Sequence, residues 1–358
     1  MTWPLPRQQC VDWFGRGEDR MPGMTMAEKI LSRASGRKVA AGEIVPVNVD
    51  FVMMHDALGP MVLDALEEMG RPLTYQPSRV AVVLDHYVPS PAATYSSMQD
   101  RLRKFAAHFG ARLFDIGEGI CHQLLPERGL ASPGAVVVGT DSHTCTYGAV
   151  GAFATGMGST DVAAILVSGR TWMMVPETIR VVLKNRLASG TSGKDIILRI
   201  ARDIGADGAT YKALEVSGPG LEHLQMEQRL TICNMAVEVG AKACLMPTDD
   251  VAAEWLRERV RGELETVIPD KDARPAQTLE YDLGQMGPLV ACPHSVDNVR
   301  AVEEVEGTPI AQALIGTCTN GRAGDLRAAA RLLEGRHVAR GVRLIIVPAS
   351  RWVLLETL

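Results

Sequence analysis

Long apolar runs are missing from this sequence of 358 residues. No uncharged hydrophobic stretch reaches the roughly 18 residues that a membrane-spanning helix requires, and the first residues lack the continuous apolar core of a signal peptide. We therefore expect a cytoplasmic protein with no membrane partner. Hydrophobic residues still make up 46% of the chain, which is enough to build two or three packed domains.

A concentration of basic charge is also missing. The formal net charge is −5, and the lysines and arginines are scattered among acids instead of forming the stripe that binds phosphate backbones. Nucleic acid is therefore not an expected partner. The seven cysteines are widely spaced and odd in number, which does not suit a disulfide framework and favours mostly buried thiols.

The sequence does contain a regular alternation of short β-branched runs and longer helical ones. RVAVVLDH and ARLFDIG are expected strands on either side of the amphipathic helix SSMQDRLRKFAAHFG, and AVVVGTDSH is an expected strand followed by a helix of small residues. This pattern predicts a multi-domain α/β fold with largely parallel sheets flanked by helices.

Changes in texture along the chain predict its division into domains. Residues 1–23 lack periodicity and are expected to be an extension, and residues 24–174 to form a first α/β domain. Residues 175–285, which open with the alternating strand VPETIRVVLKNRL, are expected to form a second. Residues 286–358 are expected to form an incomplete third, with a strand–helix–strand run. The Pro- and Gly-interrupted residues 269–295 have weak periodicity and are expected to cross into this third domain.

Three groups of polar residues follow apolar strands, where an open α/β sheet presents its carboxyl-end crevice to ligands. The first group is the pair Asp85 and His86. A carboxylate beside an imidazole can fix the ring tautomer and raise its basicity, which suits the histidine to acid–base catalysis. A purely structural strand-end pair is the alternative.

The second and third groups combine polar residues with glycine. GTDSHT holds Asp141, Ser142 and His143, and glycines follow it that let backbone approach a ligand or a neighbouring helix. GTCTNGR places Cys318 in a polar turn ahead of a helix, where a thiolate is favoured. A buried structural cysteine is the alternative reading of Cys318.

These segments resemble the aconitase superfamily. GTDSHTCTYGAVGAFATGMGSTDVA is similar to the family's Asp-Ser-His signature, and IGTCTNGRAGDLRAA is similar to its cluster-cysteine signature. LDHYVP, EGICHQLLPE, YKALEVSG and TICNMAVEVGA follow the family's order. Among its members, the chain most resembles the separate large subunits of 3-isopropylmalate dehydratase and homoaconitase.

The resemblance implies a hydro-lyase that contains a [4Fe–4S] cluster. In the family one iron of the cluster binds the substrate as a Lewis acid, and Cys318 matches the first of three cysteine ligands. His86, held by Asp85, matches the family's proton donor to the leaving hydroxyl.

The same resemblance assigns the remaining site residues. Asp141 and His122 match a second acid–imidazole pair. His143 and Glu215 match the residues that order the active-site water, and the positions that match substrate-binding residues are Ser142 and His55. The implied substrate is a 2-hydroxy di- or tricarboxylic acid such as 3-isopropylmalate, an intermediate of leucine biosynthesis, or homocitrate. The implied partner is a separate small subunit that carries the swivelling domain.

The end of the sequence departs from the family. The second and third cluster ligands come from a Cys-x-x-Cys pair beyond the first, whereas this sequence ends 40 residues after Cys318, within the expected helix SRWVLLETL. We therefore expect a chain truncated at this end, with an incomplete ligand set and little or no stable cluster. Two readings follow, a hydro-lyase subunit and a cluster-free remnant that binds a carboxylate or a partner. A zinc enzyme is less favoured, because no ligand quartet has suitable spacing.

Overall fold

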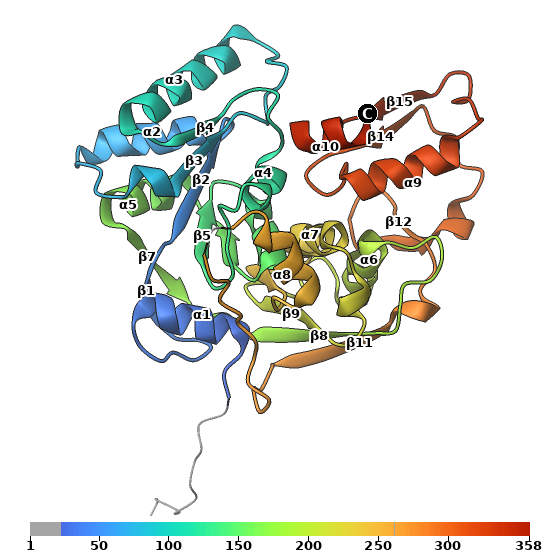
Figure 1. The fold of residues 1–358 in the computed structure, drawn as a ribbon, viewed down its shortest axis with the longest axis horizontal. Coiled ribbons are helices and arrows are strands. Elements are labelled where there is room, and N and C mark those ends of the chain that lie inside the picture. The colour runs from blue at the N-terminus through green and yellow to red at the C-terminus, as the bar shows by residue number, and fades with distance from the viewer. Residues whose placement is uncertain (1–22, 261) are drawn as a thin grey trace, which may run out of the picture.

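The computed structural model describes residues 23–260 and 262–358. The expected extension, apart from Gly23, lies outside the described residues, as does Cys10. The prediction of an α/β fold is confirmed, because two parallel sheets carry helices on their faces (Figure 1).

The first sheet has five parallel strands in the order β4-β3-β2-β5-β6. In chain order they are β2 (Phe51–His55), β3 (Val80–Val83), β4 (Arg112–Phe114), β5 (Val136–Gly139) and β6 (Phe153–Gly156). Their apolar runs are continuous because both faces are covered. The covering helices are α2 (Gly59–Met69), α3 (Ala93–Phe109) and α5 (Ser159–Ser168) on one face, with α4 (Cys121–Glu127) and the 3-10 helix η2 (Ser142–Val150) on the other.

The second sheet has four parallel strands in the order β10-β9-β8-β11. They are β8 (Thr178–Lys184), β9 (Ala213–Ser217), β10 (Ala243–Leu245) and β11 (Gln277–Asp282). One face packs into a hydrophobic core with α6 (Gly193–Ile204), α7 (Met226–Asn234) and α8 (Asp250–Arg257), and the other face packs against α1 (Met26–Ser35). Helix α1 begins with a capping box, in which Thr25 and Glu28 bond each other's backbone amides.

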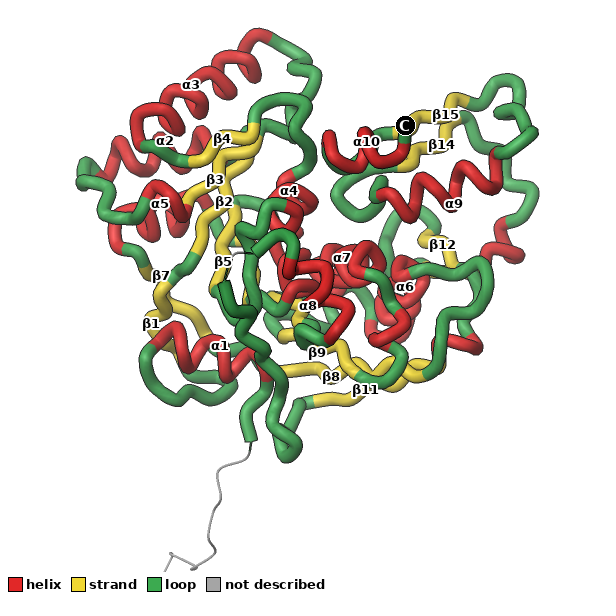
Figure 2. The backbone as a smooth tube through the Cα atoms, viewed as in Figure 1, coloured by secondary structure: helices red, strands yellow, loops and turns green. Residues whose placement is uncertain are grey.

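Three strand pairs complete the described structure, and Figure 2 shows where strands and helices lie along the tube. Strands β1 (Ile44–Asn48) and β7 (Arg170–Met174) are antiparallel, as are β12 (Leu289–Ala291) and β13 (Val299–Ala301). The parallel pair β14 (Gln312–Ile315) and β15 (Arg343–Ile346) flanks α9 (Ala323–Leu333), and α10 (Arg351–Thr357) follows. The short 3-10 helices are η1 (Pro77–Arg79), η3 (Leu221–His223), η4 (Met235–Val239), η5 (Leu283–Gln285) and η6 (Val302–Val305).

One local prediction was incomplete. Residues 269–295 are not only a crossing, since they contain β11, which pairs with β8. Strand β11 lies at the edge of its sheet and buries only Tyr281 fully, so its apolar alternation is weak. The helix of small residues expected after the strand AVVVG is the 3-10 helix η2, which begins at Ser142. Gly148 in that helix packs so tightly that an added Cβ would lie 1.4 Å from the carbonyl oxygen of Cys244.

The division into domains at residues 174 and 285 stays a prediction. Within residues 23–260 and 262–358, no helix is both long and apolar enough to cross a membrane.

Candidate active site

The carboxyl ends of β2, β3 and β5 lie side by side in the five-stranded sheet, because β2 is the neighbour of both other strands. His55 ends β2, His86 follows β3, and Asp141 follows β5. Parallel strands deliver such residues to one edge of the sheet. These three side chains therefore lie together at one edge of the sheet, and their catalytic roles stay predictions.

Asp141 is the centre of this group. Its Oδ2 faces Nε2 of His86 at 3.1 Å, and its Oδ1 faces Nε2 of His122 at 2.8 Å. Oδ1 also accepts a hydrogen bond from the backbone amide of His143 at 2.7 Å. Burial opposes ionisation of this carboxyl, but the hydrogen bonds from the three histidines outweigh it and hold its pKa far below the usual range. Asp141 is therefore an anion that orients imidazoles.

His86 lies between two carboxylates. Its Nδ1 faces Oδ1 of Asp85 at 2.8 Å, while its Nε2 faces Asp141, so both ring nitrogens are satisfied when both carry protons. Burial alone would lower the pKa of His86, yet the hydrogen bonds with Asp141 and Asp85 raise it to about 10. The side chain is 34% exposed. His86 is thus protonated at neutral pH and partly exposed.

A second accessible imidazole belongs to His143. Its Nε2 faces Oε1 of Glu238 at 3.1 Å, and its Nδ1 lies 3.3 Å from the hydroxyl oxygen of Ser142. Hydrogen bonds with Asp141 and Glu238 raise the pKa of His143 to about 10. Ser142 is exposed beside it.

The group formed by Asp85, His86, His122, Asp141, His143 and Glu238 is called the Asp141 cluster below. His122 is its most buried imidazole, with a side chain that is 1% exposed. Its Nδ1 lies 3.3 Å from the hydroxyl oxygen of Tyr147.

His55 lies beneath His86 rather than in the open. The two rings are stacked with centroids 4.0 Å apart, and the His55 side chain is 3% exposed. Nδ1 of His55 accepts from the backbone amide of Ala57, so Nε2 carries the proton and faces the carbonyl oxygen of Thr140 at 3.2 Å. Burial and the charge of His86 lower the pKa of His55. A neutral ring with both nitrogens occupied supports His86, and direct contact between His55 and a substrate stays a prediction.

The sequence interpretation missed Asp56, which directly follows β2. This carboxylate is fully buried and accepts hydrogen bonds from the backbone amides of His86 at 2.9 Å and Tyr87 at 3.1 Å. It also accepts from the side-chain amide of Gln99 at 2.9 Å. Asp56 therefore fixes the backbone that carries His86. An acid at a strand end was the available signal, the same signal that led to Asp85.

Glu215 is not part of the Asp141 cluster, and the prediction that it works with His143 is corrected by the geometry. It is the middle residue of β9, and its Oε1 accepts from the backbone amide of Ala27 at the start of α1 at 3.0 Å. Its Oε2 has no hydrogen-bond partner among the described residues. The carboxylate that meets His143 is Glu238, from the segment TICNMAVEVGA. Both acids lie in segments similar to the family, and the sequence did not show which of them faces the histidine.

Asn234 connects the turn that contains Cys318 to helix η2, which begins next to Asp141. The Cys318 thiol lies 3.7 Å from Oδ1 of Asn234, and Nδ2 of Asn234 donates to the hydroxyl of Thr146 in η2 at 2.9 Å. Arg322 is buried and holds the turn by donating to the carbonyl oxygens of Cys318 and Thr319. Cys318 is partly exposed, so it is available as a ligand.

The described residues fit a [4Fe–4S] cluster only in part. Proteins of the aconitase family use such a cluster, which needs three thiolates. Among the described residues, no set of three candidate ligand atoms within 4.8 Å of one another includes a cysteine. Cys145, two residues after His143 in the sequence, is buried, and its thiol donates to the carbonyl oxygen of Cys233 at 3.1 Å. Cys318 would thus supply one ligand of the three.

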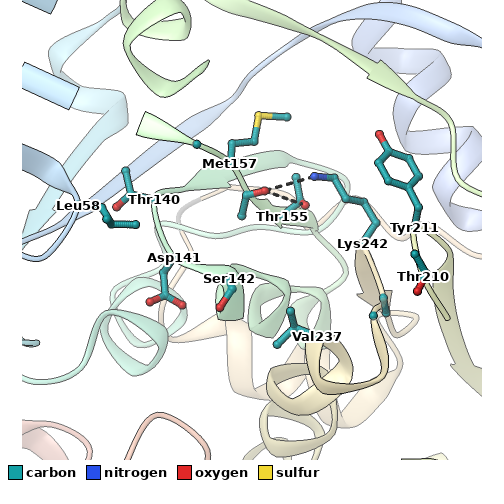
Figure 3. A pocket seen from close by; sticks show the side chains of 14 residues that line it. Leu58, Thr140, Asp141, Ser142, Thr155, Met157, Thr210, Tyr211, Val237 and Lys242 are labelled. Carbon is teal, nitrogen blue, oxygen red and sulfur yellow. Dashed lines mark hydrogen bonds between the residues drawn. The ribbon is translucent and has the colours of Figure 1, made fainter. Parts of the chain in front are cut away.

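A cavity of about 500 Å³ opens beside the Asp141 cluster (Figure 3). One wall is formed by Asp141 and Ser142, and the opposite side carries Tyr211 and Lys242. Such a volume accommodates a small organic acid. The Asp141 cluster thus contributes Asp141 to the wall of a cavity that has polar groups on both sides.

Comparison with known proteins gives one consistent family. The family model described as "Aconitase family (aconitate hydratase)" matches residues 28–308 and 300–357. Over 337 residues the chain is 48% identical to 3-isopropylmalate dehydratase large subunit 1 of Methanopyrus kandleri, which covers 94% of this chain and 81% of that protein. It is 49% identical over 339 residues to the corresponding subunit 1 of Thermotoga maritima, with 94% and 81% covered.

Two further relatives complete the comparison. The homoaconitase large subunit of Thermus thermophilus is 48% identical over 335 residues, covering 93% of this chain and 79% of that protein. The crystal structure of Thermococcus kodakaraensis aconitase X in its holo-form gives a TM-score of 0.48 at 14% identity, covering 92% of this chain and 78% of that one.

Proposed function

This chain belongs to the aconitase family, and we propose that it is the large subunit of a hydro-lyase that acts on a 2-hydroxy di- or tricarboxylic acid. The similar proteins named 3-isopropylmalate dehydratase and homoaconitase support 3-isopropylmalate or homocitrate as the substrate. With the first of these, the chain would act in leucine biosynthesis.

The observation that carries this proposal is the Asp141 cluster. His86 is charged, partly exposed and held at both nitrogens by carboxylates. A hydroxide ion is a poor leaving group, and a donor that delivers a proton to it lets it depart as water. We assign this transfer to His86, with Asp85 and Asp141 holding the ring. His122 and His143 are assigned to hydrogen-bond the substrate oxygens and water.

Elimination of water also needs a base. As the C–O bond breaks and the hydroxyl takes the proton of His86, a proton must leave the neighbouring carbon so that its electron pair forms the double bond. The family resemblance assigns this base to a serine of the small subunit. The names of the relatives, which are large subunits, support a separate partner of this kind.

The proposal includes a location and rejects one alternative. The location is expected to be the cytoplasm. The alternative, a remnant without catalysis, is not favoured, because the residues that form the Asp141 cluster are all present and bonded to one another.

The test is co-expression of the chain, extended at its carboxyl end by a segment that carries the family's Cys-x-x-Cys pair, with a cognate small subunit, followed by anaerobic loading with iron and sulfide. Dehydration makes an unsaturated acid whose double bond is conjugated with a carboxylate, so turnover is followed by ultraviolet absorbance. We expect turnover of 3-isopropylmalate or homocitrate by the complex and none by the large chain alone. Failure to form a complex, or a complex that converts neither acid, contradicts the proposal.

A further inference from the structure

The cavity beside the Asp141 cluster contains a cation that the mechanism does not use. Lys242 lines this cavity just before β10, and it is half-buried. Its Nζ donates to the carbonyl oxygen of Gly156 at 3.3 Å. An ammonium group has three N–H donors, and no described carboxylate forms an ion pair with this one. Burial lowers the pKa of Lys242, with exposed Asp161 acting on it only from a distance.

Gly156 connects Lys242 to the end of the cavity that is formed by Asp141 and Ser142. This glycine packs against the backbone of Asp141 and Ser142, since an added Cβ would lie 2.5 Å from the carbonyl oxygen of Asp141. The ammonium group that bonds Gly156 therefore faces the same cavity as the exposed hydroxyl of Ser142 (Figure 3).

Apart from the Asp141 carboxylate at one end, other lining groups suit an anion as well. Hydroxyl groups come from Thr140, Thr155 and Tyr211. Helix α5 starts directly after Gly158, which also lines the cavity and provides no side-chain cap. First-turn amides without a capping side chain favour a negative charge nearby.

We propose that Lys242 binds a carboxylate of the hydroxy acid, the one that points away from His86. This inference rests on the proposed function and adds a determinant of specificity to it. A substrate with its hydroxyl at the Asp141 cluster and a second carboxylate in this cavity would pair that carboxylate with Lys242. A charged hydrogen bond of this kind selects di- and tricarboxylic acids over otherwise similar monocarboxylic ones.

The test compares two small acids that differ in this carboxylate only. Malate and 2-hydroxybutyrate share the hydroxyl and the first carboxylate, but the second carboxylate of malate is a methyl group in 2-hydroxybutyrate. Binding is measured by calorimetry with the full chain, as wild type and as Lys242→Met, with Lys242→Gln as a second variant. We expect malate affinity to fall about 10-fold to 100-fold in both variants, while 2-hydroxybutyrate affinity stays the same.

Two controls separate charge at this position from charge in general. Lys242→Arg keeps the cation and should retain most of the preference for malate. Lys212→Met removes a neighbouring lysine whose backbone carbonyl accepts a hydrogen bond from the backbone amide of Lys242. The Lys212 side chain is not part of the cavity lining, so this variant should change the affinity for neither acid. Melting temperatures near that of the wild type verify that the variants fold.

The outcomes distinguish this inference from the proposed function. Unchanged malate affinity in Lys242→Met, or an equal loss for both acids, overturns the role of Lys242 even if the assembled enzyme is active. Malate binding that depends on Lys242 in an enzyme without hydro-lyase turnover supports the subsite and contradicts the function. A wild-type chain that binds neither acid overturns the inference.

Discussion

Asp141, which is partly exposed, and Glu215, which is buried, are two acids with opposite surroundings. Asp141 is surrounded by imidazoles, which hold its pKa far below the usual range despite burial. Glu215 meets the backbone amide of Ala27 but no charged hydrogen-bond partner, and burial raises its pKa to about 7. The first is an anion that organises a reactive group, whereas the second caps a helix and is readily protonated.

The difference comes from where each residue falls on its strand. Asp141 lies just beyond the end of β5, so its side chain leaves the sheet at the edge that His86 also reaches. Glu215 lies in the middle of β9, with Leu214 and Val216 on the opposite face in the main core. Its own face meets α1. A family motif shows which acidic residue is present, but the position of that residue on its strand determines which groups its side chain contacts.

The largest effect is expected from His86→Ala in the assembled enzyme. Loss of the proton donor should lower kcat by about 10²–10⁴ with little change in the melting temperature, because the side chain is partly exposed. Asp85→Asn should cost less, since the donor remains. The matched control is His108→Ala, on an exposed part of α3, and it should leave kcat unchanged. Near-normal turnover by His86→Ala would remove this residue from the mechanism.

A smaller loss is expected from Glu238→Gln. Replacing a charged partner of His143 with a neutral amide removes a charge-assisted hydrogen bond, which corresponds to about 10-fold to 100-fold in kcat. The pKa of His143 is raised to about 10 in part by Glu238, so the pKa of His143 should be lower in the variant. The decline of activity on the alkaline side of the pH profile should therefore begin at a lower pH than in the wild type.

The control for this change is Glu222→Gln, an exposed acid in η3. It should change neither kcat nor the pH profile. An alkaline limb that stays in place in Glu238→Gln contradicts the pairing with His143.

Local features of the sequence could be predicted, whereas the contact with Glu238 and the edge strand β11 could not. Strand ends and the parallel order are local features, so the meeting of Asp85, His86 and Asp141 at one edge was predictable. Glu238 is 95 residues away from His143, and a one-dimensional pattern does not say which of two family-like acids faces it. Strand β11 was missed because an edge strand buries few side chains and so carries little periodicity.

The smallest effect on turnover, but a clear one on stability, is expected from Glu215→Gln. The folded pKa of about 7 lies above the ordinary value of 4.5, so between these pH values the unfolded chain releases a proton that the folded chain keeps. The free energy of unfolding of the wild type should therefore fall as pH rises through this window, by about 3 kcal/mol at most. The glutamine carbonyl can still accept from Ala27, and the variant should lack this fall.

Urea unfolding at pH 5 and pH 8 checks this prediction. At pH 8 the variant should be more stable than the wild type, and at pH 5 the two should be nearly equal. Glu254→Gln, an exposed acid on α8, is the control and should keep the wild-type difference between the two pH values. Parallel pH dependence of wild type and Glu215→Gln contradicts the raised pKa.

The most direct measurement sets the two acids side by side in one assay. Asp141→Asn and Glu215→Gln are each assembled with the small subunit, loaded anaerobically and assayed for kcat with the same hydroxy acid. Loss of the central anion should lower kcat by about 10²–10⁴, whereas Glu215→Gln should stay within about threefold of the wild type, because Glu215 touches neither the Asp141 cluster nor its cavity. A severe loss in Glu215→Gln together with near-normal turnover in Asp141→Asn would contradict the account.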